Sequence, residues 1–484
     1  MMTEDVKAKA SNGKATPYRK EEDFLGEIKI PNQAYYGVQT RRAMDNFQVT
    51  GIPISHEPFM IEALGYVKKA AARANVKKGV LDPELGQKIE EACDLIISGR
   101  LNDHFCTDLI QGGAGTSINM NANEVIANVV LENMGYDKGN YDICHPNNHV
   151  NCSQSTNDVY PTAFRIALLL RIDAYIKELK LLANAMAAKA REFRHVLKMG
   201  RTQLQDAVPM SLGDEFKGWS ITILEEVDRL SDSKKLIQEI NMGATAIGTK
   251  VNAPEGYPEL VTRYLTEITG LPLKISEDLI EATSDTGAYV QLSGVMKRSA
   301  VKISKICNDL RLLSSGPRTG LNEINLPRLQ PGSSIMPGKV NPVIPEMVNQ
   351  TAYYVIGADV TVTMASEAGQ LQLNVMEPVI AFSLFTSIQW MTNACSALRS
   401  KCIDGITANE DHCREMVMNS IGIVTLLNPL LGYKVCSSIA KEALETGKSI
   451  YDLTVKEKKL VNQSQWDQLF SPDNLMNPQY VQKA

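Results

Sequence analysis

Aromatic residues are scarce in this sequence, and no apolar run is long enough to span a membrane. Phe, Trp and Tyr make up 6% of the 484 residues, and strict alternation of apolar and polar residues is rare. Both observations argue against a large β-sheet. The most apolar stretch is interrupted by Arg165, Arg171 and Asp173, so we expect no transmembrane helix.

An excess of positive charge is also missing. The 50 Lys and Arg residues are outnumbered by 55 Asp and Glu residues, and the formal net charge is −5, which argues against a nucleic-acid-binding protein. The first twenty residues have no apolar signal-peptide core, and they are not the Arg-rich, acid-poor segment of a transit peptide. We therefore expect a cytoplasmic protein in which residues 1–20 form a disordered extension.

Paired cysteine motifs are absent as well. None of the nine cysteines forms a CxxC pair, which favours reduced thiols in a cytosolic protein and argues against a zinc site. His145 and His149 have the spacing of two metal ligands on a helix. Pro146 follows His145 directly and argues against a regular helix there, so we predict no metal ligand in this pair.

Long helices dominate what is present. Apolar residues recur at spacings of three and four from Leu169 to Leu197, which predicts one helix of about eight turns. Helices of this length need partners of similar length, so the pattern favours a mainly α protein with a central helix bundle, shared between subunits. Short strands are expected near Ile28–Ile30. Further long helices are predicted at Leu212–Ile240, Gly287–Ser314, Pro342–Ala365 and Met376–Ile403.

Four polar segments interrupt these helices, and the first begins with a glycine-rich run. Gly112–Gly115 precedes Thr116 and a predicted helix, an arrangement that can present backbone amides and the positive helix end to an anion. A plain loop in which Thr116 caps the helix is the alternative. The run matches neither a dinucleotide-binding fingerprint nor a Walker motif.

The second and third segments are rich in hydrogen-bonding groups. His145–Asp158 contains Ser155, Thr156 and Asn157, and a solvated loop with a helix cap at Ser155 or Thr156 is the alternative. Gly200–Asp206 lies between two long helices, where a simple turn would not need so many polar side chains.

The fourth segment, Gly332–Pro342, is predicted to be a mobile, sharply turning loop because it contains two glycines and two prolines. It carries two serines, a lysine and an asparagine. No histidine stands nearby, so a serine-hydrolase elbow is not indicated. A passive surface loop would leave Ile335, Met336 and Val340 exposed, which favours a functional loop.

The sequence of this fourth segment, GSSIMPGKVNP, resembles the signature of the aspartase/fumarase superfamily. The other three segments resemble the remaining active-site stretches of that family, in the family's order, and the resemblance runs from about Glu22 to the C-terminus. It implies three mostly helical domains, expected here at 21–152, 153–409 and 410–484. It also implies that the central long-helix bundle forms a twenty-helix core in a homotetramer.

Several stretches resemble aspartases rather than fumarases, which implies the reversible elimination of ammonia from L-aspartate to give fumarate. Fumarases typically carry histidine where this chain has Gln203, although some aspartases carry it too. His145 stands where fumarases place a second-site histidine, so a class II fumarase is the alternative. The remaining alternatives are a lyase acting on argininosuccinate or adenylosuccinate and a catalytically silent structural member. The aspartase-like stretches are GRTQLQDAVPMSLGDEF, GATAIGT, EDLIEATSD, GLNEINLP and AGQLQLNVMEPV.

The resemblance further implies an active site built by three subunits. Ser333 would be the general base, and Lys339 and Asn341 would hold one substrate carboxylate. Hydroxyl donors would stabilise the other carboxylate as it takes up charge, and Asn157 and Gln203 would bind the leaving amino group. No cofactor is required; some relatives respond to divalent cations, but the sequence shows no cluster of metal ligands. The first chain would supply Thr116, Ser155, Thr156 and Asn157, the second Thr202 and Gln203, and the third Ser333, Ser334, Lys339 and Asn341.

Overall fold

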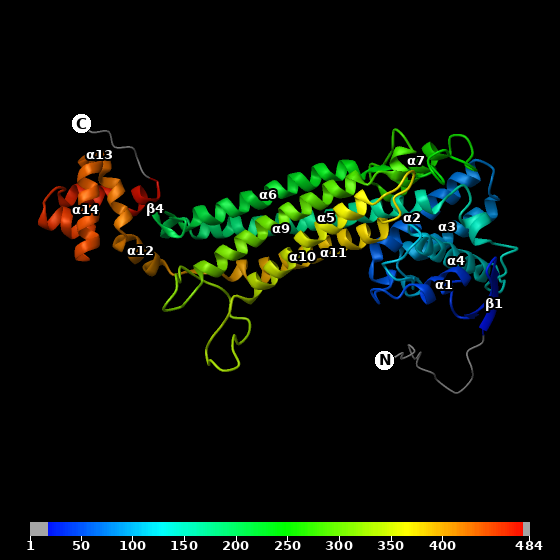
Figure 1. Cartoon of the computed structure of the whole chain (residues 1–484), viewed down its shortest axis with the longest axis horizontal. Helices are drawn as coiled ribbons and strands as arrows, with labels where there is room; N and C mark the ends of the chain where they lie inside the picture. Colours follow the sequence, from blue (N-terminus) through cyan, green and yellow to red (C-terminus); the bar gives the residue numbers. More distant parts are fainter. Residues whose placement is uncertain (1–17, 478–484) are drawn as a thin grey trace. The chain divides into compact units, whose positions relative to one another are not determined.

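The computed structural model describes residues 18–477, which are mostly helical (Figure 1). The chain divides into two compact units. The first contains residues up to 173 together with 231–294 and 357–388, and the second contains 174–230, 295–356 and the residues from 389 onward. The mainly α class expected from the sequence is confirmed, whereas the division into three domains stays a prediction.

The first unit begins with a β-hairpin followed by buried helices. Strands β1 (Tyr18–Asp23) and β2 (Gly26–Pro31) pair antiparallel. Helix α4 is buried from Ile118 to Leu131, so it forms the centre of this part, and α2 packs against α3, α4 and α7. The helices are α1 (Val38–Asn46), α2 (Pro58–Lys77), α3 (Pro83–Ile97), α4 (Thr116–Asn133), α7 (Tyr257–Thr269) and α8 (Glu281–Ser284).

The N-terminal strand corrects one expectation. Residues 1–17 lie outside the described residues, but Tyr18 to Lys20 belong to β1 and are not disordered. The Arg19 guanidinium holds them in place, because it pairs with Glu21 at 2.7 Å and donates to the carbonyl oxygens of Ala34 and Tyr36. Such long-range contacts leave no trace in a local sequence pattern.

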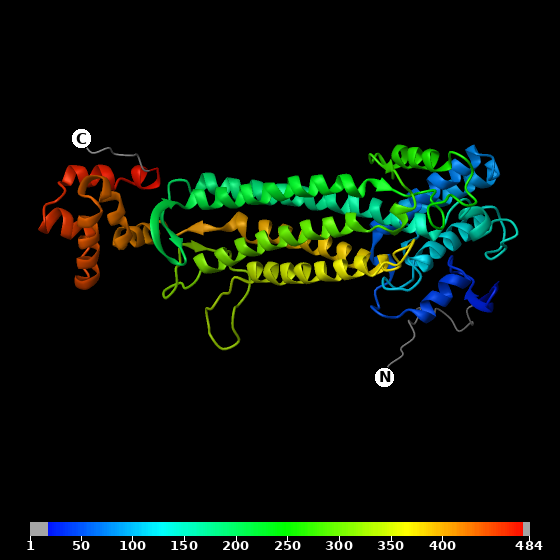
Figure 2. The ribbon, with the colours of Figure 1, turned by 45° about the horizontal axis from the view of Figure 1, so that its top comes forward.

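Five long helices contribute residues to both units (Figure 2). In the first unit, the Phe164 ring of α5 packs against Tyr289 of α9 and Phe385 of α11. In the second unit, Tyr175 of α5 hydrogen-bonds Ser299 of α9 at 2.7 Å. The helices are α5 (Thr156–Glu192), α6 (Leu212–Ile237), α9 (Gly287–Leu313), α10 (Val343–Glu367) and α11 (Glu377–Lys401).

These five helices confirm the long helices predicted from the sequence, but both ends of the first differ from the prediction. Helix α5 begins at Thr156, before the apolar stripe that starts at Leu169. Helix α5 ends at Glu192, so Phe193 lies beyond it and Leu197 begins strand β3. The chain turns here because the Phe193 carbonyl accepts hydrogen bonds from the amides of Val196 and Gly213. Leu197 is buried on the strand, so the apolar spacing continues although the helix does not.

The rest of the second unit contains a β-hairpin and short helices around a small apolar core. Strands β3 (Leu197–Thr202) and β4 (Gln205–Ser211) pair antiparallel, so the third polar segment is a hairpin tip and not a simple turn. Leu197 and Met199 of β3 pack with Leu427, Trp466 and other buried residues of the C-terminal helices. Those helices are α12 (Glu410–Asn419), the 3-10 helix Ile421–Leu427, α13 (Asn428–Leu431), α14 (Tyr433–Thr446), α15 (Gln463–Leu469) and α16 (Pro472–Met476).

Two sequence expectations concern sheets and membranes. Throughout residues 18–477, every sheet has two strands, in agreement with the scarcity of alternating patterns. Over the same residues, no helix is both long and apolar enough to cross a membrane.

Candidate active site

The glycine-rich run forms a tight turn that starts helix α4. Gly113 and Gly115 have φ values of 90° and 91°, and a Cβ atom on Gly115 would come within 2.3 Å of the Tyr160 ring. Glycine at position 115 therefore allows the start of α4 to approach α5. Thr116 is the first residue of α4, and its hydroxyl donates to the Gly113 carbonyl oxygen at 2.7 Å.

Helix α5 begins beside this turn and carries three of the predicted site residues. Thr156 is its first residue, and Asn119, one turn into α4, donates to the Thr156 hydroxyl oxygen at 3.1 Å. The Ser155 hydroxyl oxygen accepts the Asn157 backbone amide at 3.2 Å. The structure thus brings Thr116, Ser155, Thr156 and Asn157 together around the N-terminal ends of two helices, where backbone amides favour a negatively charged group.

A buried aspartate holds this group of residues, and the sequence analysis missed it. The Asp158 carboxylate accepts the amides of Ser155 at 3.0 Å, Gly243 at 3.1 Å and Thr245 at 2.8 Å. Burial raises the pKa of Asp158 to about 7, although the backbone donors and Lys68 oppose that shift. Only its position directly after Ser155, Thr156 and Asn157 could have indicated this role from the sequence, since two of its three partners are more than eighty residues away.

Residues 241–246 also contact the site. The Asn157 side chain donates to the Ala246 carbonyl oxygen at 2.7 Å, and the Asn241 side chain donates to the Asn157 carbonyl oxygen at 3.0 Å. The aspartase-like stretch GATAIGT, which contains Ala246, therefore helps to fix the orientation of Asn157.

Thr202 and Gln203 lie at the exposed tip of the β3–β4 hairpin. The two residues of the turn, Gln203 and Leu204, have φ values of 53° and 64°, which are uncommon for side chains of this size. Such backbone strain is concentrated at functional sites. The strand is anchored directly before this tip, because the guanidinium of Arg201, the residue before Thr202, pairs with the carboxylate of Glu323, whose side chain is fully buried.

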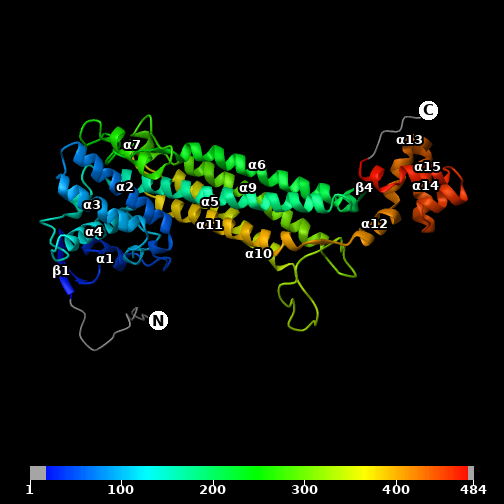
Figure 3. The same cartoon turned by 180° about the vertical axis from the view of Figure 1, so that it is seen from behind.

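The segment Gly332–Asn341 belongs to the long loop between α9 and α10, which extends away from both helices in Figures 1 and 3. Its neck is closed by two hydrogen bonds, from the Gly332 amide to the Lys339 carbonyl oxygen at 2.7 Å and from the Asn341 side chain to the Gly332 carbonyl oxygen at 2.8 Å. Ser334 and Lys339 are exposed, and Ile335 is 83% exposed.

Ser333 has the surroundings that an ionised hydroxyl would need. Its Oγ accepts the backbone amides of Ile335 at 3.2 Å and Met336 at 3.1 Å. Hydrogen bonds from fixed amides favour the charged form of an oxygen acid. The ten predicted residues thus form three local groups: one at the starts of α4 and α5, one at the hairpin tip and one in this loop.

The histidine pair is tied into its own backbone. Residues Pro146–Val150 form one π-helical turn, in agreement with the expectation that Pro146 prevents a regular α-helix. The Nδ1 atom of His149 accepts the His145 amide at 2.9 Å, and the Nδ1 atom of His145 accepts the amides of Asn147 and Asn148. Burial lowers the pKa of both imidazoles, and His149 further lowers that of His145.

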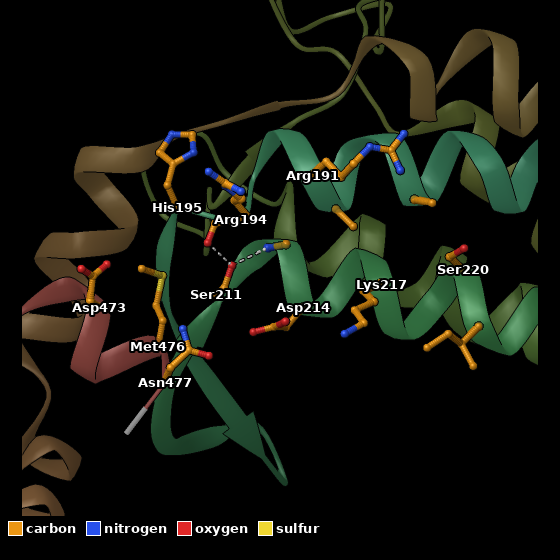
Figure 4. Close-up of a pocket in the computed structure, with 14 residues that line it drawn as sticks. Arg191, Arg194, His195, Ser211, Asp214, Lys217, Ser220, Asp473, Met476 and Asn477 are labelled. Carbon is orange, nitrogen blue, oxygen red and sulfur yellow. Dashed lines mark hydrogen bonds between the residues drawn. The ribbon is translucent and has the colours of Figure 1, made fainter. Parts of the chain in front are cut away.

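A pocket of about 700 Å³ lies elsewhere, in the second unit (Figure 4). Its wall contains Arg191, Arg194 and Lys217 together with Asp214 and Asp473. None of the ten predicted residues lines it, and its charged side chains are exposed, so we do not place the chemistry there.

Comparison with known proteins identifies the family. Residues 26–357 match the family described as lyase, and residues 423–477 match the fumarase C C-terminus. The chain belongs to this lyase family. The superfamily predicted from GSSIMPGKVNP is therefore confirmed.

The relatives match nearly the whole chain. Aspartate ammonia-lyase of Helicobacter pylori (strain 26695) is 54% identical over 465 residues, which cover 96% of this chain and 99% of the relative. Aspartate ammonia-lyase of Pseudomonas fluorescens is 56% identical over 468 residues, which cover 96% and 98%.

Solved structures share the fold. The fumarate lyase:delta crystallin from Brucella melitensis bound to cobalt has a TM-score of 0.92 and 51% identity, covering 94% of this chain and 99% of that chain. The class II fumarase from Schistosoma mansoni has a TM-score of 0.90 and 33% identity, covering 96% and 100%.

Proposed function

We propose that the protein is an aspartate ammonia-lyase, which catalyses the reversible anti elimination of ammonia from L-aspartate to give fumarate. The observation that carries this proposal is the full-length identity of 54–56% with curated aspartate ammonia-lyases, against 33% with a class II fumarase. Gln203 supports it, since fumarases typically carry histidine there. His145 keeps the class II fumarase as the second candidate.

The chemical problem is removal of a proton from the carbon beside a carboxylate. The resulting carbanion is reachable only if that carboxylate takes up the charge as an enediolate, so the site needs fixed donors around it. Thr116, Ser155 and Thr156 supply hydroxyls at two helix N-termini, where the amide dipoles also favour negative charge. Ser334 of another subunit adds a further hydroxyl.

Ser333 is proposed as the general base. The two backbone amides that its Oγ accepts stabilise the oxyanion that a serine must become before it can take a proton. Lys339 and Asn341 hold the second carboxylate, and Asn157 and Gln203 bind the leaving amino group. The exposed Ile335 favours a loop that closes over bound substrate and excludes water.

The proposed assembly is a homotetramer whose sites combine groups from three subunits. The distribution of the ten residues over three local groups supports it. Large apolar side chains that are exposed on α6 and α10 also support the tetramer, because apolar residues that repeat along a helix are usually buried against another helix or subunit. These are Ile221, Leu224 and Leu236 on α6, and Tyr353, Val360 and Met364 on α10. The twenty-helix core and the three-domain division belong to the same proposal.

The proposed chemistry needs a small-molecule substrate and no organic cofactor. It also needs no divalent cation, although the Brucella relative was solved bound to cobalt. We further propose that the protein acts in the cytoplasm.

The proposed roles are tested with Ser333→Ala. Wild-type protein should release fumarate and ammonia from L-aspartate in equal amounts, and a silent structural protein would release neither. Because the hydroxyl acts in the transition state, the variant should lose several orders of magnitude in turnover while substrate binding changes little. A variant within about tenfold of wild-type turnover would move the search for the base to another residue.

A further inference from the structure

Lys68 places a positive charge in the interior of the first unit, directly behind the group of Ser155, Thr156 and Asn157. It lies on α2 with 0% of its surface exposed. Its Nζ atom donates to Asn151 Oδ1 and to Gln154 Oε1, both at 2.9 Å. Both acceptors belong to the short segment that leads into α5.

These two contacts connect Lys68 to the predicted substrate hydroxyls. Asn151 Oδ1 also accepts the side-chain amide of Asn119 at 3.2 Å, and the same amide donates to the Thr156 hydroxyl oxygen. The Gln154 side-chain amide donates to the carbonyl oxygens of Val150 and Cys152. One ammonium group thus holds two side chains that fix the backbone immediately before Ser155.

Keeping this lysine in the interior costs free energy. Burial lowers the pKa of Lys68 to about 7, which Asp158 and Cys93 only partly oppose. A well-packed apolar residue generally costs less free energy in such a position than a buried charge. The two hydrogen bonds to Asn151 and Gln154 offset part of this cost, so the free energy spent on burying Lys68 goes into fixing the segment before Ser155.

We propose that Lys68 is a positioning residue for the carboxylate-binding group formed by Ser155 and Thr156, acting through Asn151 and Gln154. The predicted effect of Lys68 on turnover rests on the proposed function, whereas its predicted effect on the segment 151–157 does not. When Lys68 is protonated, its charge also favours the negative charge that grows on the carboxylate in the transition state, since interactions in a poorly solvated interior are weakly screened.

The test compares Lys68→Met with Lys69→Met in the full-length assembled protein. Lys69 is the matched control, because it lies on the same helix and pairs at 2.6 Å with Asp94, whose side chain is 56% exposed. Hydrogen–deuterium exchange of the peptide containing residues 151–157 should become faster in Lys68→Met and stay unchanged in Lys69→Met. With L-aspartate, kcat should fall about tenfold or more in Lys68→Met while KM changes by less than about threefold.

The exchange measurement decides the positioning role, and turnover of the wild-type protein decides the function. Unchanged exchange in residues 151–157 would overturn the inference even if L-aspartate is the substrate. If exchange is faster in Lys68→Met but the wild-type protein does not turn over L-aspartate, the positioning role of Lys68 is supported and the aspartase proposal is rejected.

A second variant covers the case in which Lys68→Met does not assemble. Gln154→Ala removes one of the two acceptors at a half-buried position, so it disturbs the fold less. It should accelerate exchange in the same peptide and lower kcat in the same direction by a smaller factor. Wild-type exchange and kcat in Gln154→Ala would overturn the inference.

Discussion

Glu323→Gln should destabilise the protein strongly, because Glu323 is the only carboxylate recorded in an ion pair with the Arg201 guanidinium among the described residues. The Glu323 side chain is fully buried, and it also contacts Lys198 Nζ at 3.1 Å. Lys198 keeps a second partner in Glu215. Arg201, only 14% exposed, would face a neutral amide.

The expected loss of unfolding free energy is about 2–4 kcal/mol. Hydrogen bonds to charged groups contribute about 1.5–3 kcal/mol each, and removing one partner of a buried ion pair costs about 3–5 kcal/mol. Gln keeps the shape of Glu, and water reaches part of the Arg201 side chain. The expected loss therefore lies near the lower end of the range for a broken buried ion pair. Turnover should also fall, because Arg201 anchors the hairpin that carries Thr202 and Gln203.

Urea unfolding at a fixed protein concentration measures the effect. Glu410→Gln is the matched control, since Glu410 pairs with His195 at 3.2 Å and the two side chains are 56% and 62% exposed. That variant should lose less than about 0.5 kcal/mol. If Glu323→Gln were as stable as Glu410→Gln, the buried pair would not anchor the hairpin.

Three further predictions concern charge, assembly and pH. Lys339→Ala should raise KM and lower kcat together in steady-state assays, because the proposed role of the lysine is to hold a carboxylate in the ground and transition states alike; an unchanged KM would exclude this role. Mixing the inactive Ser333→Ala protein with the inactive Thr202→Ala/Gln203→Ala protein should restore activity after subunit exchange, whereas a fully active monomer in sedimentation would rule out shared sites. Burial raises the pKa of Glu377 from 4.5 to about 8, although Arg165 opposes the shift. The fold therefore favours neutral Glu377, and stability should fall as pH rises between about 5 and 8, less steeply in Glu377→Gln, as melting temperatures would show.

The long helices could be predicted because their apolar residues repeat over many turns. Helices α6, α9, α10 and α11 begin and end within three residues of the predicted positions. The β3–β4 hairpin could not be predicted, because its strands contain Lys198, Gly200 and Pro209 without regular alternation. The cost of burying Lys198 is offset by Glu323, which is distant in the sequence.

The same distinction applies to the site. The polar segments were visible because glycine turns and hydroxyl clusters are local features of the sequence. Asp158 and Lys68 were not, because each acts through partners brought together only by folding, such as Gly243 and Asn151. Ile335 shows the opposite limit. Its apolar side chain argues against a passive surface loop, yet it is 83% exposed in the single chain.

The choice of L-aspartate as substrate is tested directly by one comparison. Since L-aspartate and L-malate both give fumarate, one preparation of the wild-type protein can be assayed with each by the ultraviolet absorbance of fumarate. We expect kcat/KM for L-aspartate to exceed kcat/KM for L-malate by a wide margin. Equal or faster turnover of L-malate would contradict it and establish a fumarase.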